Sequence, residues 1–189
     1  MSYPSKLSKE SILQVAMAYI EAHGLAELSM RFLAVELGVT PNALYRYFSS
    51  KADLEYAMAD EAGRLLLAAM TKAAARKNPL EAIQAVVQAY LKFARSHPEL
   101  YAVKMQFFTI NGQEPSSHTE VWQFVTQLAA AVPTRWEPKD LAVSLWAFLH
   151  GMVDLDRKGM LEGEKPERFI EVGLEVILAG MLTGLTAPA

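Results

Sequence analysis

The sequence predicts an all-α protein of about nine helices, and three observations indicate this class. Five of the nine prolines stand where a helical segment begins, a position at which the missing backbone donor costs nothing. Polar residues stand at capping-box spacing, with Asn78 before Glu81 and Ser117 before Glu120. No segment alternates apolar and polar residues between turn signals, as a half-buried strand does. The five prolines are Pro41, Pro79, Pro98, Pro138 and Pro166.

These signals divide the 189 residues into helices and turns. The longest loop is polar and covers residues 111–117. Residues 1–52 are expected to form a helix-turn-helix domain of three helices, and residues 53–189 a larger helical domain. The expected helices are residues 8–23, 30–37, 41–48, 51–76, 79–96, 98–109, 117–131, 138–158 and 166–183.

Composition limits the class of protein further. The chain has no cysteine, which excludes disulfide bonds and thiolate metal sites and fits a reducing cytoplasm. No apolar run approaches the ~20 residues of a membrane span, and the N-terminus lacks the apolar core of a signal peptide. We therefore expect a cytoplasmic protein without membrane contact. Its net charge of −3 at pH 7 confines any contact with DNA to one face.

The most informative stretch is residues 29–51, which predicts two short helices joined by a tight turn. In the first helix, Phe32, Leu33 and Leu37 lie on or near one side, and the small Ala34 faces the partner helix. Gly38 is expected to end this helix, since glycine leaves helical geometry without a Cβ clash.

The second helix of this stretch begins with favourable residues. The hydroxyl of Thr40 is expected to cap it, and Pro41 fits its first position. Leu44 and Phe48, four residues apart, form a narrow buried stripe. The residues left facing outward are Thr40, Asn42, Ala43, Tyr45, Arg46 and Tyr47.

Two helices with a glycine turn and an exposed second helix indicate a helix-turn-helix motif, whose second helix lies in the major groove of DNA. Short side chains at its start let the backbone approach the bases, and Arg31 can bond to a guanine through its paired donors. Tyrosine and basic side chains suit phosphates, which set register. The predicted DNA-contacting residues are Ser29, Arg31, Thr40, Pro41, Asn42, Ala43, Tyr45, Arg46, Tyr47 and Lys51.

A longer set of residues surrounds this motif. It comprises Ile12, Ala16, Gly24, Leu28-Ser29-Met30-Arg31, Leu33-Ala34, Leu37-Gly38-Val39, Leu44-Tyr45-Arg46-Tyr47-Phe48, Ser50-Lys51 and Leu54. Residues 8–58 therefore resemble the N-terminal domain of the TetR family of bacterial transcriptional regulators. The resemblance implies a homodimer that binds double-stranded operator DNA, responds to a small effector and by default represses transcription.

The C-terminal part is rich in large apolar residues. Most of them simply fill a core, but an aromatic cavity between helices is also where small ligands bind. His97-Pro98-Glu99-Leu100-Tyr101 after Ala94, and Trp146 with His150-Gly151 and Leu155, resemble the Trp-x-x-x-His-Gly group of TetR ligand domains. We expect an apolar or aromatic effector near Tyr90, Phe93, Tyr101, Met105, Phe108, Trp122, Trp146 and His150.

His150 shares a helix face with Trp146 and Asp154, each four residues away. Three interpretations are open: a hydrogen bond to the effector, a metal site with Asp154, or a core histidine bonded to a neighbouring helix. Two ligands without a third are weak evidence for a metal. We therefore predict neither a metal nor a cofactor.

The last two predicted helices are expected to form a homodimer. Gly173, Ala179, Gly180 and Gly184 are small enough for a partner helix to approach closely. Apolar residues cover much of the circumference of the final helix, more than the core of one subunit requires. A two-fold dimer predicts a partly palindromic operator with half-sites about 34–36 Å apart or at a related multiple.

The predicted helix at residues 51–76 has two interpretations. Ser50 is expected to cap it, with Asp53 three residues on. Because the helix joins the DNA-reading part to the rest of the chain, it can act as a lever; alternatively it is an ordinary amphipathic helix.

Two rival functions come from other classes. An enzyme lacks support, because no GxSxG, HExxH, phosphate-loop or dinucleotide glycine pattern occurs. A helical carrier or adaptor would not need the exposed polar face at residues 40–51.

Overall fold

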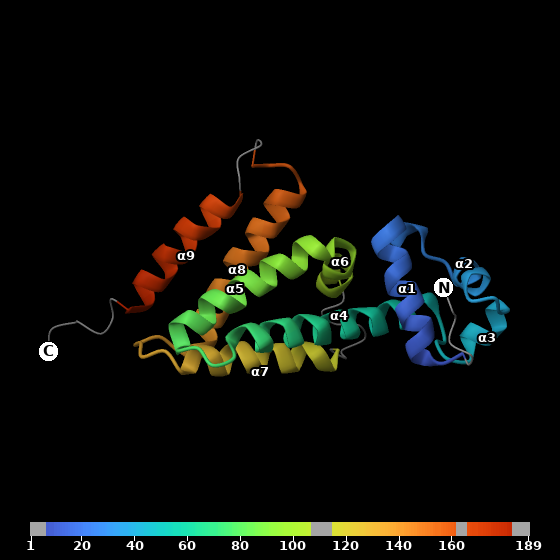
Figure 1. Ribbon diagram of the computed structural model, residues 1–189, viewed down its shortest axis with the longest axis horizontal. Coiled ribbons are helices and arrows are strands. Elements are labelled where there is room, and N and C mark those ends of the chain that lie inside the picture. Colours follow the sequence, from blue (N-terminus) through green and yellow to red (C-terminus); the bar gives the residue numbers. More distant parts are fainter. Residues whose placement is uncertain (1–6, 107–114, 162–165, 183–189) are drawn as a thin grey trace, which may run out of the picture. The chain divides into compact units, whose positions relative to one another are not determined.

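The computed structural model describes residues 7–106, 115–161 and 166–182 (Figure 1). These residues form helices and turns and contain no strand, which confirms the all-α prediction. In chain order the elements are α1 (Lys9–His23), the short 3-10 helix η1 (Leu25–Glu27), α2 (Met30–Glu36), α3 (Pro41–Tyr45), α4 (Lys51–Ala74), α5 (Pro79–Ser96), α6 (Pro98–Gln106), α7 (Ser116–Ala130), α8 (Pro138–Arg157) and α9 (Pro166–Leu182).

The predicted helix starts are confirmed at all five prolines, which are the first residues of α3, α5, α6, α8 and α9. Two predicted caps are also confirmed. The side chain of Asn78 accepts a hydrogen bond from the Glu81 amide at 3.0 Å, and Ser50 accepts one from the Asp53 amide at 3.0 Å. These signals succeed because each acts within one turn of its own helix.

The predicted cap at Ser117 is wrong, and so is the end of the predicted loop. The helix α7 begins at Ser116, so Ser117 lies inside its first turn. The Ser117 amide donates to the carboxylate of Asp60, 2.8 Å away, which lies on α4. The start of α7 is therefore capped by the carboxylate of Asp60, which is distant in sequence, and not by the hydroxyl of Ser117.

Other boundaries differ by a few residues. The helix α3 ends at Tyr45 instead of residue 48, because the amide of Tyr47 bonds to the Leu44 carbonyl in a tighter turn, at 2.9 Å. The helix α4 ends at Ala74, shortly before Arg76 adopts a positive φ of 61°. The 3-10 helix η1 was not predicted. Predictions for residues 107–109 and 111–114, and for Phe108 and Gly184, lie outside the described residues.

The chain divides into two compact units. One is drawn from residues 1–67 and 93–121, and the other from residues 68–92 and 122–189. The boundaries between units fall inside α4, α5 and α7, so each of these helices contributes residues to both. The expected division after residue 52 follows the sequence motif alone and stays a prediction.

The first unit has a core built on one face of α1. Ile12, Ala16 and Ile20, spaced by one turn, are fully buried. The helix α1 contacts α2, η1 and α6. Two carboxylates also link α1 and η1 to α6: Glu21 accepts from the Leu100 amide at 2.9 Å, and Glu99 accepts from the Leu25 amide at 3.3 Å. Each carboxylate caps the start of a distant helix.

The second unit contains α8 packed against α9 (Figure 1). The buried face of α9 presents Ile170, Leu174 and Met181. A Cβ added at Gly173 would collide with the ring of Phe148, so glycine is required there for close helix packing.

Candidate nucleic-acid interface

The turn between α2 and α3 is fixed by its backbone. Gly38 has φ +66°, and its amide donates to the Val35 carbonyl at 3.0 Å. The amide of Val39 donates to the Ala34 carbonyl at 2.9 Å. This is the paired bonding that ends a helix with a left-handed residue, as predicted for Gly38. A Cβ at Gly38 would meet nothing within 4 Å, so conformation, not space, requires glycine.

The buried side of the motif holds α2 against α3. Leu33 and Ala34 of α2 are each 1% exposed, Leu44 of α3 is fully buried, and Phe48 follows at 3%. These burials confirm the predicted stripe. Phe32 was expected on the same side of α2 as Leu33, and this prediction is wrong. The Phe32 side chain is 44% exposed and packs on the ring of Tyr19, with 4.9 Å between the ring centroids.

The start of α3 is free of the predicted cap. The side chain of Thr40 makes no capping bond; instead the Ala43 amide donates to the backbone carbonyl of Thr40 at 2.9 Å. The acceptor at the start of α3 is therefore the carbonyl of Thr40 and not, as was expected, its hydroxyl. The exposed Thr40 side chain is therefore available at the surface beside Pro41 and Asn42, which are also exposed.

The rest of the predicted DNA-contacting face is mostly exposed. Tyr45 is 48% exposed, and Arg31 and Arg46 are exposed, whereas Ala43 is half-buried. Ser29 caps α2 by accepting from the Phe32 amide at 3.1 Å, and its hydroxyl can still donate to a phosphate.

Two residues predicted to contact phosphates have partners within the protein. The hydroxyl of Tyr47 donates to the Leu7 carbonyl at 2.9 Å and so fastens the chain before α1 to the end of α3. Lys51 forms an ion pair with Glu55 at 3.4 Å on the surface of α4. The Lys51 side chain is 39% exposed, so the pair is screened by water and can give way to a phosphate. The DNA contacts of these residues stay predictions.

The start of α1 adjoins this face. Ser8 and Ser11 bond reciprocally, with the Ser11 amide on the Ser8 hydroxyl at 3.1 Å and the Ser8 amide on the Ser11 hydroxyl at 2.9 Å. The ammonium of Lys9 lies 5.7 Å from the centre of the Phe48 ring. Together with the bond from Tyr47, these contacts hold α1 and the end of α3 in one arrangement.

The residues predicted to line an effector site fall in different units. Phe93, Tyr101 and Met105 belong to the first, while Tyr90, Trp122, Trp146 and His150 belong to the second. Within the second unit, Trp122 meets Trp146 edge to face at 5.8 Å, and Trp146 stacks on His150 at 5.5 Å with an interplanar angle of 15°. The structure therefore brings together three of the predicted residues, from α7 and α8.

The metal interpretation of His150 gains no support. The carboxylate of Asp154 is 2.7 Å from the ammonium of Lys158. This hydrogen bond, helped by the charges of Lys158, His150 and Arg157, lowers the pKa of Asp154. In the part of the chain that the structure describes, no three His, Asp or Glu side chains are grouped as metal ligands.

Sequence reasoning missed the carboxylates that cap distant helices. Asp60, Glu21 and Glu99 each accept a backbone hydrogen bond from a residue more than fifty positions away. No local spacing signals such a bond, because the partners meet only when the helices pack.

Among the described residues, no helix is both long and apolar enough to cross a membrane. The exposed helix α3, held by a glycine turn against α2 within an all-α chain, defines a helix-turn-helix DNA-binding protein. A family model described as "Bacterial regulatory proteins, tetR family" matches residues 12–58, and one described as "Tetracyclin repressor-like, C-terminal domain" matches residues 83–177. The chain belongs to the TetR family of transcriptional regulators.

Individual relatives agree with this assignment. An uncharacterized HTH-type transcriptional regulator of Mycobacterium tuberculosis, Rv0681, is 25% identical over 84% of this chain and 74% of its own. The fold matches a Rhodococcus sp. RHA1 protein of unknown function with a TM-score of 0.80, at 24% identity over 95% of this chain and 99% of that one. It also matches BioQ in complex with its double-stranded DNA operator, with a TM-score of 0.68 and 26% identity over 94% and 99%. The family favours regulation over the carrier alternative.

Proposed function

We propose that this DNA-binding regulator is a ligand-responsive repressor that acts in the cytoplasm. It binds a partly palindromic operator as a homodimer and leaves the operator when a small apolar or aromatic effector binds. The observation that carries the proposal is the second apolar face of α9, which lies opposite its buried face. Its large exposed residues are Phe169, Val172 and Val176, at 38%, 56% and 66% exposure.

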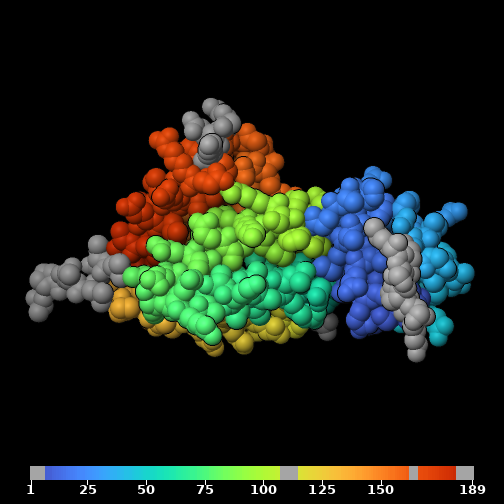
Figure 2. All heavy atoms as spheres, viewed as in Figure 1, coloured from blue at the N-terminus to red at the C-terminus, as the bar shows by residue number. Residues whose placement is uncertain are grey.

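This face supports a dimer. The three residues are spaced by three and four positions, so they form one stripe along α9. The exposed Ala179 and Gly180 continue the stripe with small side chains, and α9 lies at the surface of its unit (Figure 2). A stripe of this kind is buried when two copies pair about a two-fold axis. Pairing then presents two α3 helices to one operator.

The dimer is tested by sedimentation of the whole chain at micromolar concentration. We expect a dimer for the wild type and a monomer for Val176→Asp, because the new carboxylate would be buried in the interface. Glu175→Gln is the matched control, since Glu175 is exposed and adjacent on the same helix. A wild-type monomer would contradict the dimer.

The aromatic cluster of Trp122, Trp146 and His150 supports an effector site in the second unit. All three side chains are half-buried, and their rings offer flat apolar surfaces beside the polar ring nitrogens. Sites for small molecules commonly combine an apolar lining with few polar groups. We infer that His150 bonds to a polar atom of the effector.

DNA binding and response are tested in two steps. Selection of bound duplexes from a random pool, repeated at several salt concentrations, should enrich a partly palindromic sequence. A compound library is then screened for release of that duplex. For the first compound that releases it, His150→Ala should alter the response and leave duplex affinity unchanged. An unaltered response would remove His150 from the site, and no enriched palindrome would contradict the proposal.

A further inference from the structure

The start of α1 lies against the end of α3, the recognition helix of the motif. The hydroxyl of Tyr47, two residues after α3, donates to the carbonyl of Leu7 at 2.9 Å. Lys9, the first residue of α1, places its ammonium 5.7 Å from the centre of the Phe48 ring. Two successive residues after α3 therefore contact the start of α1, although Leu7 and Tyr47 are 40 positions apart.

The backbone around Lys9 is fixed on both sides. Tyr47 holds Leu7, and Ser8 and Ser11 bond reciprocally, so the first turn of α1 has little freedom. The hydroxyl of Ser11 also donates to the carbonyl of Ser8 at 3.0 Å. Because these bonds engage the polar groups of the two serines, what the start of α1 offers to an anion is the charge of the exposed Lys9 side chain.

The neighbouring carboxylate of Glu10 is directed to its own helix. The pKa of Glu10 is lowered first by a hydrogen bond from its own backbone amide, then by one from Ser8, and least by the charge of Lys9. Adjacent residues on a helix do not face each other, and an acid in the first turn stabilises the start of a helix. Glu10 therefore stabilises α1 and leaves the ammonium of Lys9 over the Phe48 ring.

Lys9 adds a positive charge to a segment that already has a positive balance. Residues 39–51 contain two basic residues, Arg46 and Lys51, and no acidic residue. Arg46 directly follows α3 and is exposed, whereas Lys51 shares its charge with Glu55. An anion beside the end of α3 would therefore meet the charges of Arg46 and of Lys9.

The length of α3 places Lys9 at the border of the groove. The helix has five residues, which corresponds to about 7 Å. The major groove is about 12 Å wide, so a helix this short fits between the phosphates that border it. Side chains just beyond the end of α3 then face these phosphates. Lys9, held over Phe48, is such a side chain.

We propose that Lys9 contacts a DNA phosphate beside the groove read by α3, and that Tyr47 positions it through Leu7. The proposal rests on the part of the proposed function that concerns operator binding, and it involves neither the effector nor the dimer. Tyr47 then acts through α1 and not by the direct phosphate contact predicted from the sequence. Because a phosphate contact reads no bases, its loss weakens the binding of all duplexes alike.

The first test measures duplex affinity of the whole protein and of Lys9→Gln over a range of salt concentrations. Two duplexes are used: the one enriched from the random pool, and an unrelated one of the same length. Lys9→Gln should weaken both about tenfold, the effect of losing one hydrogen bond between charged groups. The slope of log affinity against log salt should fall by about 0.9 for each protomer bound. Lys9→Arg should restore both values, since it keeps the charge.

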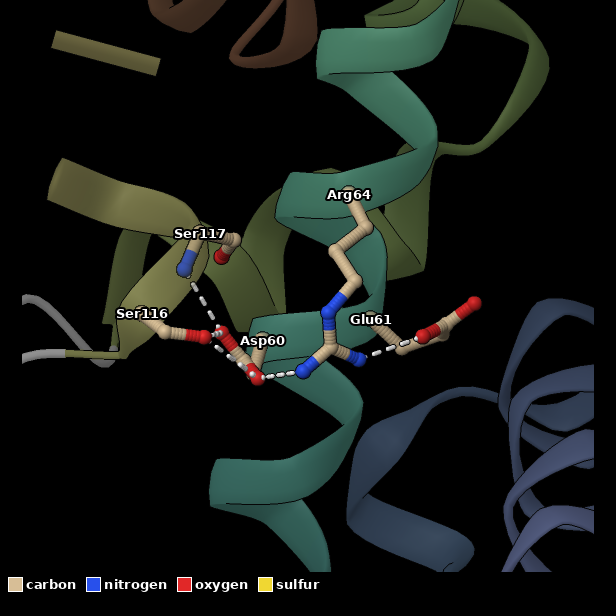
Figure 3. Close-up of polar contacts among 5 residues, drawn as sticks. All are labelled: Asp60, Glu61, Arg64, Ser116 and Ser117. Carbon is tan, nitrogen blue, oxygen red and sulfur yellow. Dashed lines mark hydrogen bonds and ion pairs between the residues drawn. The ribbon is translucent and has the colours of Figure 1, made fainter. Parts of the chain in front are cut away.

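Arg64→Gln is the matched control for the change in net charge. Arg64 also belongs to the first unit and is exposed. It lies about 20 Å along α4 from Lys51, and Asp60 and Glu61 pair with its guanidinium (Figure 3). Its loss should leave the salt slope unchanged. An unchanged slope for Lys9→Gln, or an equal fall for Arg64→Gln, would show that Lys9 contacts no phosphate.

The second test separates positioning by Tyr47 from a direct contact. Tyr47→Phe removes the hydroxyl that bonds to Leu7 and keeps the ring. It should weaken duplex binding about threefold in the wild-type background and have no effect in the Lys9→Gln background, because residues that act as one unit are not additive. Affinities are compared where helical circular dichroism shows each variant to be folded. Equal losses in both backgrounds would refute the positioning role.

Failure of this proposal can be told from failure of the proposed function. If no palindrome is enriched, the proposed function fails, and the unrelated duplex still tests Lys9, because phosphates are common to every sequence. If a palindrome is enriched and Lys9→Gln binds it with the wild-type salt slope, the proposed function stands and the contact of Lys9 is wrong.

Discussion

Lys104 provides a test of how burial sets the stability of the first unit. The side chain lies on α6 and is 7% exposed, and burial lowers its pKa from 10.5 to about 8. At about 1.4 kcal/mol for each pKa unit, this difference corresponds to about 3 kcal/mol between the charged and neutral forms. The charged amine therefore opposes folding at neutral pH.

The sign follows from proton binding. Between pH 8 and 10.5 the unfolded chain binds a proton at Lys104 that the folded chain does not. Stability should therefore rise with pH through this window and gain about 3 kcal/mol in all. Below pH 8 both states are protonated, and the folded state carries the full cost of the buried charge.

The assay compares urea unfolding of wild type and Lys104→Met from pH 7 to 10.5. Helical circular dichroism is the appropriate signal, because Trp122, Trp136 and Trp146 all belong to the second unit and Lys104 to the first. The variant should gain stability relative to wild type at pH 7, and the gain should shrink towards pH 10.5. Lys92→Met, at an exposed position, is the control and should show no such trend. A difference between wild type and Lys104→Met that is independent of pH would refute the reasoning.

Three further predictions concern the reading motif. Gly38→Ala should lower the free energy of unfolding by about 1–2 kcal/mol in urea titrations, because φ +66° is unfavourable for alanine; an unchanged midpoint would contradict this. Leu44→Ala should cost about 2–5 kcal/mol, because the side chain is fully buried, and a smaller loss would mean that the site collapses around the cavity. In duplex-binding titrations, Arg31→Ala should relax base preference at one position by about 1–3 kcal/mol, whereas Lys51→Ala should weaken all sequences alike. Equal effects of the two changes on all sequences would show that Arg31 reads no base.

The reading motif combines features set by nearby residues with features set only by packing. The glycine turn at Gly38 and the buried pair Leu44 and Phe48 were predictable, because a turn and a helix face depend on residues a few positions apart. The exposure of Phe32 was not predictable, because its ring packs outside the core on Tyr19, which belongs to another helix. The family resemblance was also predictable from the sequence, and DNA binding was predictable from that resemblance.

The residues of the proposed effector site, in contrast, could not be grouped from the sequence. Eight aromatic or apolar residues were expected to line it, and sequence could not show that the seven described ones are divided between two compact units. The structure groups Trp122, Trp146 and His150, which lie on α7 and α8. Periodicity identifies the face of one helix, but it does not identify the helix that this face meets.

The sequence by itself determined the helices, their starts and the reading motif, since prolines, glycines and caps act within one turn of the chain. Only the tertiary structure decided which partners satisfy the remaining backbone donors. The Ser117 amide pairs with Asp60 and the Leu100 amide with Glu21, in place of any neighbour. A buried donor takes whichever acceptor packing brings within about 3 Å, and that choice is made in space, not along the sequence.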